Sequence, residues 1–104
     1  MPVQSVTSLS ELQSIINSGK PVAIDFYAIW CGPCRMISPR FEALSDKYSS
    51  VQFVKVDVDQ AGEIAQAMQI TAMPTFIMFK DGKKVDTIVG ADATQLEAAI
   101  SKIA

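Results

Sequence analysis

The sequence predicts an α/β fold, a central mixed sheet of about five strands flanked by four helices in the order βαβαβαββα. Apolar runs rich in β-branched and aromatic residues alternate with segments whose apolar residues recur every three or four positions. Late in the chain, two strand-like runs are separated only by Asp81-Gly82, a strong hairpin signal. Because parallel strands need crossovers and hairpin strands do not, a parallel βαβ half should join an antiparallel ββα half.

The first third of the chain reads as strand, helix and strand. Residues 3–6 form a short edge strand, and Ser8 and Glu11 have the spacing of a capping box. This box predicts a helix that ends before Gly19. The apolar residues that this helix should bury are Leu9, Leu12, Ile15 and Ile16. Residues 22–29 are almost continuously apolar, which is typical of a strand covered on both faces.

The middle of the chain repeats this order. A long helix should begin at Pro33 and be kinked by Pro39. Its apolar face consists of Ile37, Phe41, Leu44 and Tyr48. Residues 51–58 form another central strand, and a short helix follows it. The apolar side of that helix consists of Ala61, Ile64, Ala65 and Met68.

The last third of the chain supplies the antiparallel pair and a final helix. Residues 75–80 and 83–89 form the two hairpin strands. The residues that alternate along the second strand are Val85, Thr87 and Val89. Asp92, with Gln95 three positions later, predicts the start of the final helix. Its apolar face consists of Leu96, Ala99, Ile100 and Ile103.

Composition excludes several classes of function. The 104 residues predict a single domain, 1–104, that is large enough to fold without a disulfide or a metal. Nine basic and eleven acidic residues give a net charge of -2, so no nucleic-acid partner is expected. No apolar run is long enough to span a membrane, and residues 1–5 lack the pattern of a secretion signal. We therefore expect a cytoplasmic protein, with a nuclear pool or an organellar form left open.

The only two cysteines, Cys31 and Cys34, lie where the central strand ends and the long helix begins, in a chain without histidine. Sites in such sheets lie beyond the carboxyl ends of the strands. A closed zinc site normally takes four ligands, and a structural disulfide across so short a loop would restrict the unfolded chain very little. The remaining alternative is that both cysteines are buried apolar residues without a chemical role. Reversible thiol–disulfide exchange explains the pair best.

The spacing of the cysteines assigns a role to each. A thiol at a helix N-terminus faces unpaired N–H groups and the positive end of the helix dipole, so Cys31 is the predicted nucleophile. Cys34, one turn further along, can resolve a mixed disulfide between Cys31 and a substrate. Pro33 stiffens the ring between them, and Gly32 leaves the approach to Cys31 open.

The chain resembles the thioredoxin family over essentially its whole length. The matching residues are Trp30-Cys31-Gly32-Pro33-Cys34, Asp25 in the preceding strand, and Met73-Pro74-Thr75 before the hairpin. The resemblance implies a cis peptide bond at Pro74 that faces the cysteines, and a general protein-disulfide reductase activity without a bound cofactor. It also implies electrons from NADPH through thioredoxin reductase. Client proteins would be of the ribonucleotide reductase, peroxiredoxin and methionine sulfoxide reductase types.

Asp25 interrupts an apolar strand, and a buried carboxylate is costly unless it is paired or protonated. One interpretation is structural, an ion pair with Lys55 across the sheet. The other, which the resemblance supports, has Asp25 beneath Cys34, accepting the proton of that thiol through water while Lys55 modulates its charge. In the same way, the family implies that Gly32 and Pro33 tune the redox potential.

An apolar surface around the cysteines is a candidate docking site for clients. It comprises Ile29, Trp30, Gly32, Pro33, Met73, Pro74, Gly90 and Ala91. The alternative is that Trp30 and Met73 belong to the core. Three residues depart from the common family pattern: Tyr27 replaces a second tryptophan, Ile29 a polar residue and Arg35 a lysine.

Two other classes of function stay open at this point, a redox-inert adaptor and a disulfide oxidase or isomerase. The Gly-Pro dipeptide between the cysteines resembles the reducing members of the family. Isomerases usually carry a histidine before the second cysteine, and this chain has none. We expect a monomer, and a dimer through the docking surface is not excluded by the sequence.

Overall fold

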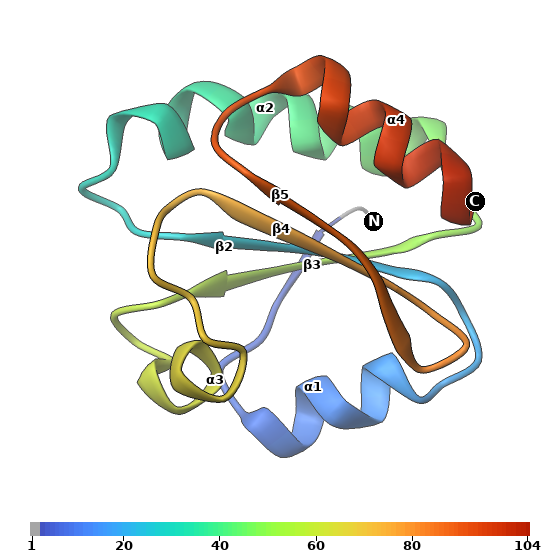
Figure 1. Cartoon of the computed structure of the whole chain (residues 1–104), viewed down its shortest axis with the longest axis horizontal. Helices are drawn as coiled ribbons and strands as arrows, with labels where there is room; N and C mark the ends of the chain where they lie inside the picture. The colour runs from blue at the N-terminus through green and yellow to red at the C-terminus, as the bar shows by residue number, and fades with distance from the viewer. Residues whose placement is uncertain (1–2) are drawn as a thin grey trace.

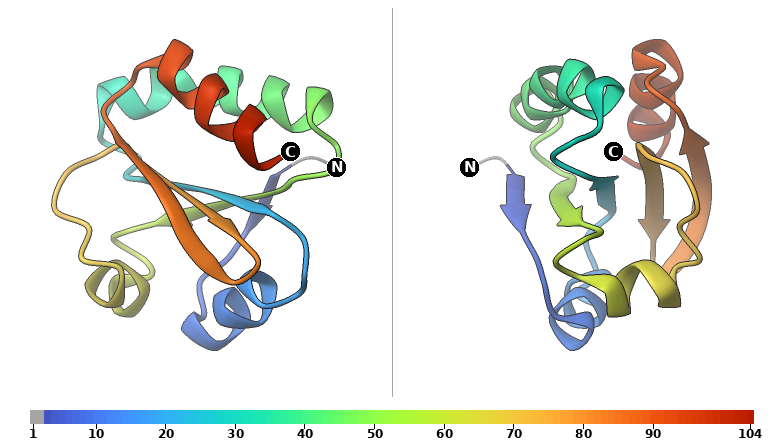
Figure 2. Two further views of the ribbon diagram at one scale, coloured as in Figure 1. Left: turned by 45° about the vertical axis from the view of Figure 1, so that its right-hand side comes forward. Right: turned by 90° about the vertical axis from the view of Figure 1, so that its left-hand side faces the viewer.

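The computed structural model describes residues 3–104, which form one twisted sheet with two helices on each face (Figure 1). The strands are β1 (Val3–Ser5), β2 (Val22–Tyr27), β3 (Gln52–Asp57), β4 (Thr75–Lys80) and β5 (Lys83–Val89). The helices are α1 (Leu9–Ile16), α2 (Gly32–Lys47), α3 (Gly62–Ala67) and α4 (Ala93–Ile103). Helices α2 and α4 cover one face, and α1 and α3 cover the other (Figure 2).

The strand order is β1-β3-β2-β4-β5, which places β2 at the centre of the sheet. Strand β3 pairs in parallel with both β1 and β2. Strand β4 pairs antiparallel with β2, and β5 pairs antiparallel with β4. The predicted mixed sheet and its element order are therefore confirmed.

Local signals account for where several elements begin and turn. The Ser8 Oγ accepts a hydrogen bond from the Glu11 N–H at 3.3 Å and caps α1, and Asp92 caps α4 through the Gln95 N–H at 3.0 Å. At the hairpin, Asp81 and Gly82 have φ values of 55° and 77°. These left-handed conformations suit the two-residue turn that joins β4 to β5.

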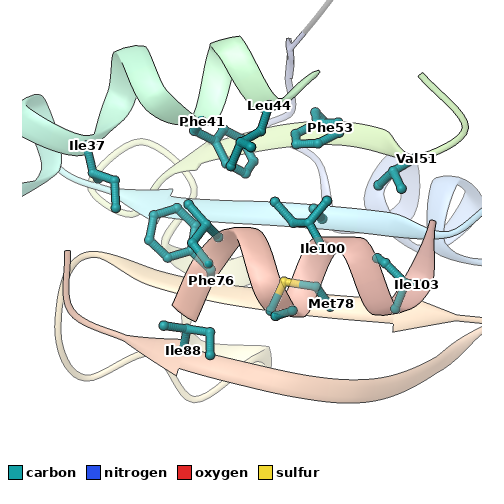
Figure 3. Close-up of a cluster of buried hydrophobic side chains, with 13 residues drawn as sticks. Ile37, Phe41, Leu44, Val51, Phe53, Phe76, Met78, Ile88, Ile100 and Ile103 are labelled. Carbon is teal, nitrogen blue, oxygen red and sulfur yellow. The ribbon is translucent and has the colours of Figure 1, made fainter. Parts of the chain in front are cut away.

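Two apolar clusters hold the helices to the sheet. Beneath α2 and α4, Phe41 packs against Phe53 and Phe76, with ring centroids 5.1 and 5.5 Å apart (Figure 3). On the opposite face, residues of α1 and α3 pack against the same strands. That second cluster includes Leu12, Ile16, Ile24, Phe26, Val54 and Ile64. The central strand is consequently buried on both faces, as its apolar sequence predicts.

Some boundaries differ from the prediction. Strand β2 ends at Tyr27, so the prediction that it extends to residue 29 is wrong, because Ile29 lies in the following turn with 69% of its surface exposed. On β5, Val85 and Val89 are exposed and Ile88 is the buried residue. Pro39 lies within α2, which continues on both sides of it. In the part of the chain described, none of the helices is long and apolar enough to cross a membrane.

Candidate active site

The two cysteines lie at the junction of β2 and α2, as the sequence predicts. Cys31 is the N-cap residue of α2, and its Sγ accepts a hydrogen bond from the Cys34 N–H at 3.2 Å. A sulfur in this position faces the positive end of the helix dipole. The same arrangement stabilises a thiolate when the disulfide is reduced.

Cys31 and Cys34 form a disulfide, with their Cα atoms 5.3 Å apart. Cys31 is 6% exposed and Cys34 is 3% exposed, so the nucleophile predicted from the sequence is the more accessible of the two. They pack with Ala28 in a small cluster that Met73 covers from one side. Between residues 3 and 104, no group of three or more potential ligands is arranged to hold a metal ion.

A second segment approaches the disulfide from the start of β4. The Met73-Pro74 peptide bond is cis, and the Met73 carbonyl oxygen lies 3.8 Å from Cys31 Sγ. The Gly90 N–H donates a hydrogen bond to the Pro74 carbonyl at 2.9 Å, which holds the end of β5 against this segment. Gly90 has a φ of 105°, a conformation that favours glycine. Residues far apart in the sequence therefore meet at one end of the sheet.

The residues predicted to form an apolar surface around the cysteines are exposed or half-buried, except for one. Trp30 is 64% exposed, so the alternative that it belongs to the core is wrong. Met73 is half-buried, with its apolar body against the cysteine cluster. Pro74 is buried and adds nothing to the exposed surface, which corrects its inclusion there.

Asp25 is buried on the central strand, directly opposite Lys55 on β3. Its Oδ1 has no hydrogen-bond partner among the described residues. Within residues 3–104, the ion pair that forms joins Lys47 to Glu97 and does not involve Asp25. The structural interpretation of Asp25 as an ion-pair partner of Lys55 is therefore wrong. Burial raises the pKa of Asp25 from the ordinary 3.8 to about 7, and the positive charge of Lys55 acts in the opposite direction.

A cavity of about 160 Å³ connects Asp25 with the inner cysteine. Its lining residues are Asp25, Tyr27, Ala28, Ile29, Cys34, Arg35, Ser38 and Lys55. A space of this volume accommodates several water molecules. Two of the lining residues, Ile29 and Arg35, are exposed, and Arg35 Nη1 donates a hydrogen bond to the Ile29 carbonyl at 2.8 Å. The geometry thus offers a route for a proton between Asp25 and Cys34.

Two contacts of the site were not foreseen from the sequence. The Trp30 Nε1–H donates a hydrogen bond to Asp59 Oδ2 at 2.8 Å, and Arg35 binds the Ile29 carbonyl. Asp59 follows β3, and the carboxyl ends of the parallel strands β2 and β3 lie side by side. The place of Asp59 after such a strand was the one feature of the sequence that could have indicated its proximity to the site.

Tyr27, at the end of β2, also has a shifted pKa. Burial raises the pKa of Tyr27, and the negative charges of Asp57 and Asp25 raise it further.

Comparison with known proteins gives one consistent answer. The sequence model of the family described as Thioredoxin matches residues 3–102. A thioredoxin from Coprinus comatus is 51% identical over 102 residues, which cover 96% of this chain and 96% of the relative. Solved structures similar to this fold include the oxidised form of mitochondrial thioredoxin 3 from Saccharomyces cerevisiae. That structure has a TM-score of 0.93 and 43% identity, over 96% of this chain and 94% of the other.

A further similar structure comes from work on the thiol resolving mechanism of yeast mitochondrial 1-Cys peroxiredoxin through glutathione and thioredoxin systems. It has a TM-score of 0.93 and 42% identity, and the match covers 96% of this chain and 94% of that one. Fold, sequence and the paired cysteines at a helix N-terminus all agree. The chain belongs to the thioredoxin family of thiol–disulfide oxidoreductases.

Proposed function

We propose that this chain reduces protein disulfides, with Cys31 as the nucleophile and Cys34 as the resolving thiol. The observation that carries the assignment is the position of Cys31 at the N-cap of α2, where its sulfur accepts the Cys34 N–H. An N-terminal helix position favours the thiolate of Cys31 over the thiol. Cys34 lies within the first turn of the helix and is less exposed than Cys31.

The reaction consists of two exchanges. The Cys31 thiolate attacks one sulfur of the client disulfide, a mixed disulfide forms, and the second client sulfur leaves as a thiolate that takes up a proton. Cys34 then loses its proton and attacks Cys31 Sγ, which breaks the mixed disulfide. The client leaves as a dithiol, and the Cys31–Cys34 disulfide seen here is the oxidised product. Two electrons pass to the client in each cycle.

Asp25 is the proposed acceptor of the Cys34 proton. Both residues line the same cavity, which has room for a bridging water. Because burial raises its pKa to about 7, Asp25 can take up and release protons near neutral pH, whereas an ordinary aspartate would stay ionised. Lys55 opposes this rise and thereby sets where Asp25 titrates.

The remaining site residues shape recognition and the ring. We assign docking of extended client segments to Ile29, Trp30, Met73, Gly90 and Ala91, and the large side chains of Ile29 and Trp30 are exposed. Pro74 holds Met73 beside Cys31 and receives the Gly90 N–H. Gly32 and Pro33 form the ring of the disulfide and are proposed to tune its potential.

The electron supply and the partners follow from the same reaction. An oxidised dithiol must be reduced again before the next cycle, and we propose NADPH, acting through thioredoxin reductase, as the source. A peroxiredoxin is a proposed client, supported by the similar structure studied with a peroxiredoxin. We extend the proposal to ribonucleotide reductase and methionine sulfoxide reductase. A single-domain monomer in the cytoplasm, a compartment that keeps thiols reduced, fits this cycle.

Reduction of insulin tests the proposed function directly. With dithiothreitol as the electron source, a few micromolar of the chain should accelerate precipitation of the insulin B chain. Cys31→Ser should give only the rate of dithiothreitol alone, because the capturing thiolate is gone. If the unmodified chain does not exceed that background rate, it is not a disulfide reductase.

A further inference from the structure

We propose that Asp57, at the end of β3, is a positioning residue for client docking. Its carboxylate orders the loop that carries Asp59, and Asp59 in turn fixes the indole of Trp30 beside Cys31. Asp57 itself is buried, and among the described residues it forms no hydrogen bond with either cysteine. The inference rests on the docking role proposed above for Trp30.

The first link is the loop after β3. Asp57 Oδ1 accepts hydrogen bonds from the N–H groups of Asp59 at 2.9 Å and Gln60 at 3.4 Å. The Asp57 carbonyl accepts a third, from Ala61, at 2.8 Å. Asp57 is only 8% exposed, and a buried carboxylate needs such partners. Ala61, the N-cap residue of α3, offers no side-chain cap, so Asp57 provides the side-chain hydrogen bonds that order this loop.

The second link joins this loop to the active site. Asp59 Oδ2 accepts the Trp30 Nε1–H at 2.8 Å, a contact between residues 29 positions apart in the sequence. A hydrogen bond to an ionised acceptor is stronger than one between neutral groups. Trp30 is otherwise exposed over 64% of its surface, and its indole has only this one donor. The hydrogen bond therefore restrains a large side chain that is mostly exposed.

Restraint of this kind favours binding. A client that docks on a freely rotating indole must also immobilise it, and this entropy cost lowers affinity. An indole already held in one orientation avoids that cost. Val58 also donates its N–H to the Tyr27 carbonyl at 2.9 Å, which fixes the loop to the end of β2, three residues before Trp30. Asp57 is thus connected to Trp30 through a short and well-anchored path.

A purely structural role of Asp57, as a turn cap, predicts different behaviour. A cap affects stability, whereas a positioning residue also affects KM for a protein client and the environment of Trp30. The chain contains a single tryptophan, so its fluorescence reports Trp30 alone. Asp57→Asn keeps an oxygen that can accept the same N–H groups, and Asp57→Ala removes it.

The experiment compares Asp57→Ala, Asp57→Asn, Asp59→Ala and the control Ser8→Ala in the full chain. Ser8 caps α1, a helix on the sheet face opposite to α2, so its variant removes a cap without touching this path (Figure 2). Circular dichroism first establishes that each variant is folded. KM and kcat are then measured with insulin, and acrylamide quenching of Trp30 is measured on the reduced protein.

Asp57→Ala and Asp59→Ala should each raise KM about threefold to tenfold, the range for one lost hydrogen bond, and keep kcat within about twofold. Both should increase the quenching of Trp30. Asp57→Asn should restore both readouts, and Ser8→Ala should change neither. Equal KM and quenching for Asp57→Ala and Ser8→Ala would overturn the inference, as would an Asp57→Asn variant as impaired as Asp57→Ala.

A Trp30→Ala variant separates this inference from the proposed function on which it rests. If Trp30→Ala raises KM but Asp57→Ala does not, only the positioning role of Asp57 is refuted. If Trp30→Ala leaves KM unchanged, the docking role of Trp30 fails first and the inference fails with it. Loss of insulin reduction in the unmodified chain would instead refute the proposed reductase function.

Discussion

Replacing Asp25 by asparagine should change the pH dependence of stability in a defined direction. The folded protein holds the Asp25 carboxyl with a pKa of about 7, against the ordinary 3.8 that applies to the unfolded chain. Between these two values the unfolded chain is ionised while the folded protein is still protonated. The folded state therefore binds more protons, and its stability falls as pH rises through this window. The amide of asparagine does not titrate, so the variant lacks this loss.

The size of the effect follows from the same two pKa values. At about 1.4 kcal/mol for each pH unit, the penalty to the unmodified protein is about 2 kcal/mol at about pH 5 and about 4 kcal/mol at about pH 7. Asp25 is 4% exposed, so solvent screening reduces this penalty little. The variant should therefore gain about 2 kcal/mol relative to the unmodified protein between these two pH values.

Urea unfolding of the oxidised proteins, followed by circular dichroism, measures this gain. The oxidised state is chosen because disulfide-bonded cysteines do not titrate. Glu42→Gln, the same carboxylate-to-amide change at an exposed position of α2, serves as the control. A constant offset between Asp25→Asn and the unmodified protein reports packing or hydrogen bonding, and only the pH-dependent part reports ionisation. A difference in unfolding free energy that is the same at both pH values would refute the buried, raised-pKa description of Asp25.

Three further predictions concern the proton, the thiols and the core. Lys55→Met removes the charge that lowers the pKa of Asp25, so the carboxyl should titrate at higher pH in ¹³C NMR spectra, and an unchanged or lower midpoint would contradict this role. In the reduced protein, iodoacetamide should alkylate Cys31 well before Cys34, and equal labelling seen by peptide mass mapping would contradict the assigned roles. Phe41→Ala should cost about 3–5 kcal/mol in urea unfolding, because Phe41 is 1% exposed between two aromatic rings, and a cost below about 1 kcal/mol would contradict its place in the core.

Features set by neighbouring residues were predictable from the sequence. The Asp81-Gly82 turn depends on two backbone conformations, and the caps Ser8 and Asp92 act on N–H groups three positions away. The order of helices and strands was predictable for the same reason, because each element is recognised from the spacing of apolar residues within a short segment. The end of β2 was not predictable, because Ile29 is apolar like the strand residues before it. Only the folded chain shows that this residue lies on an exposed turn.

The site divides in the same way. The positions of Cys31 and Cys34 could be predicted, because α2 begins directly after Cys31 and contains Cys34 in its first turn. The sequence suggested that Asp25 and Lys55 lie on neighbouring strands, and they do. Their side chains nevertheless do not form an ion pair, which the sequence alone could not decide. The hydrogen bond from Trp30 to Asp59 depends on the conformation of the loop after β3, so no local sequence pattern predicts it.

The two-step exchange is the central claim, and trapping of clients on single-cysteine variants tests it most directly. Cys34→Ser retains the capturing thiolate, but a serine hydroxyl is a poor nucleophile near neutral pH, so the mixed disulfide with oxidised insulin should accumulate until a reducing thiol is added. Cys31→Ser should trap almost nothing, because the remaining Cys34 is only 3% exposed and lies within the first turn of α2. Non-reducing gels should therefore show adducts for Cys34→Ser and a bare monomer band for Cys31→Ser. Equal adducts on both variants, or adducts on neither, would contradict the assignment of capture to Cys31 and release to Cys34.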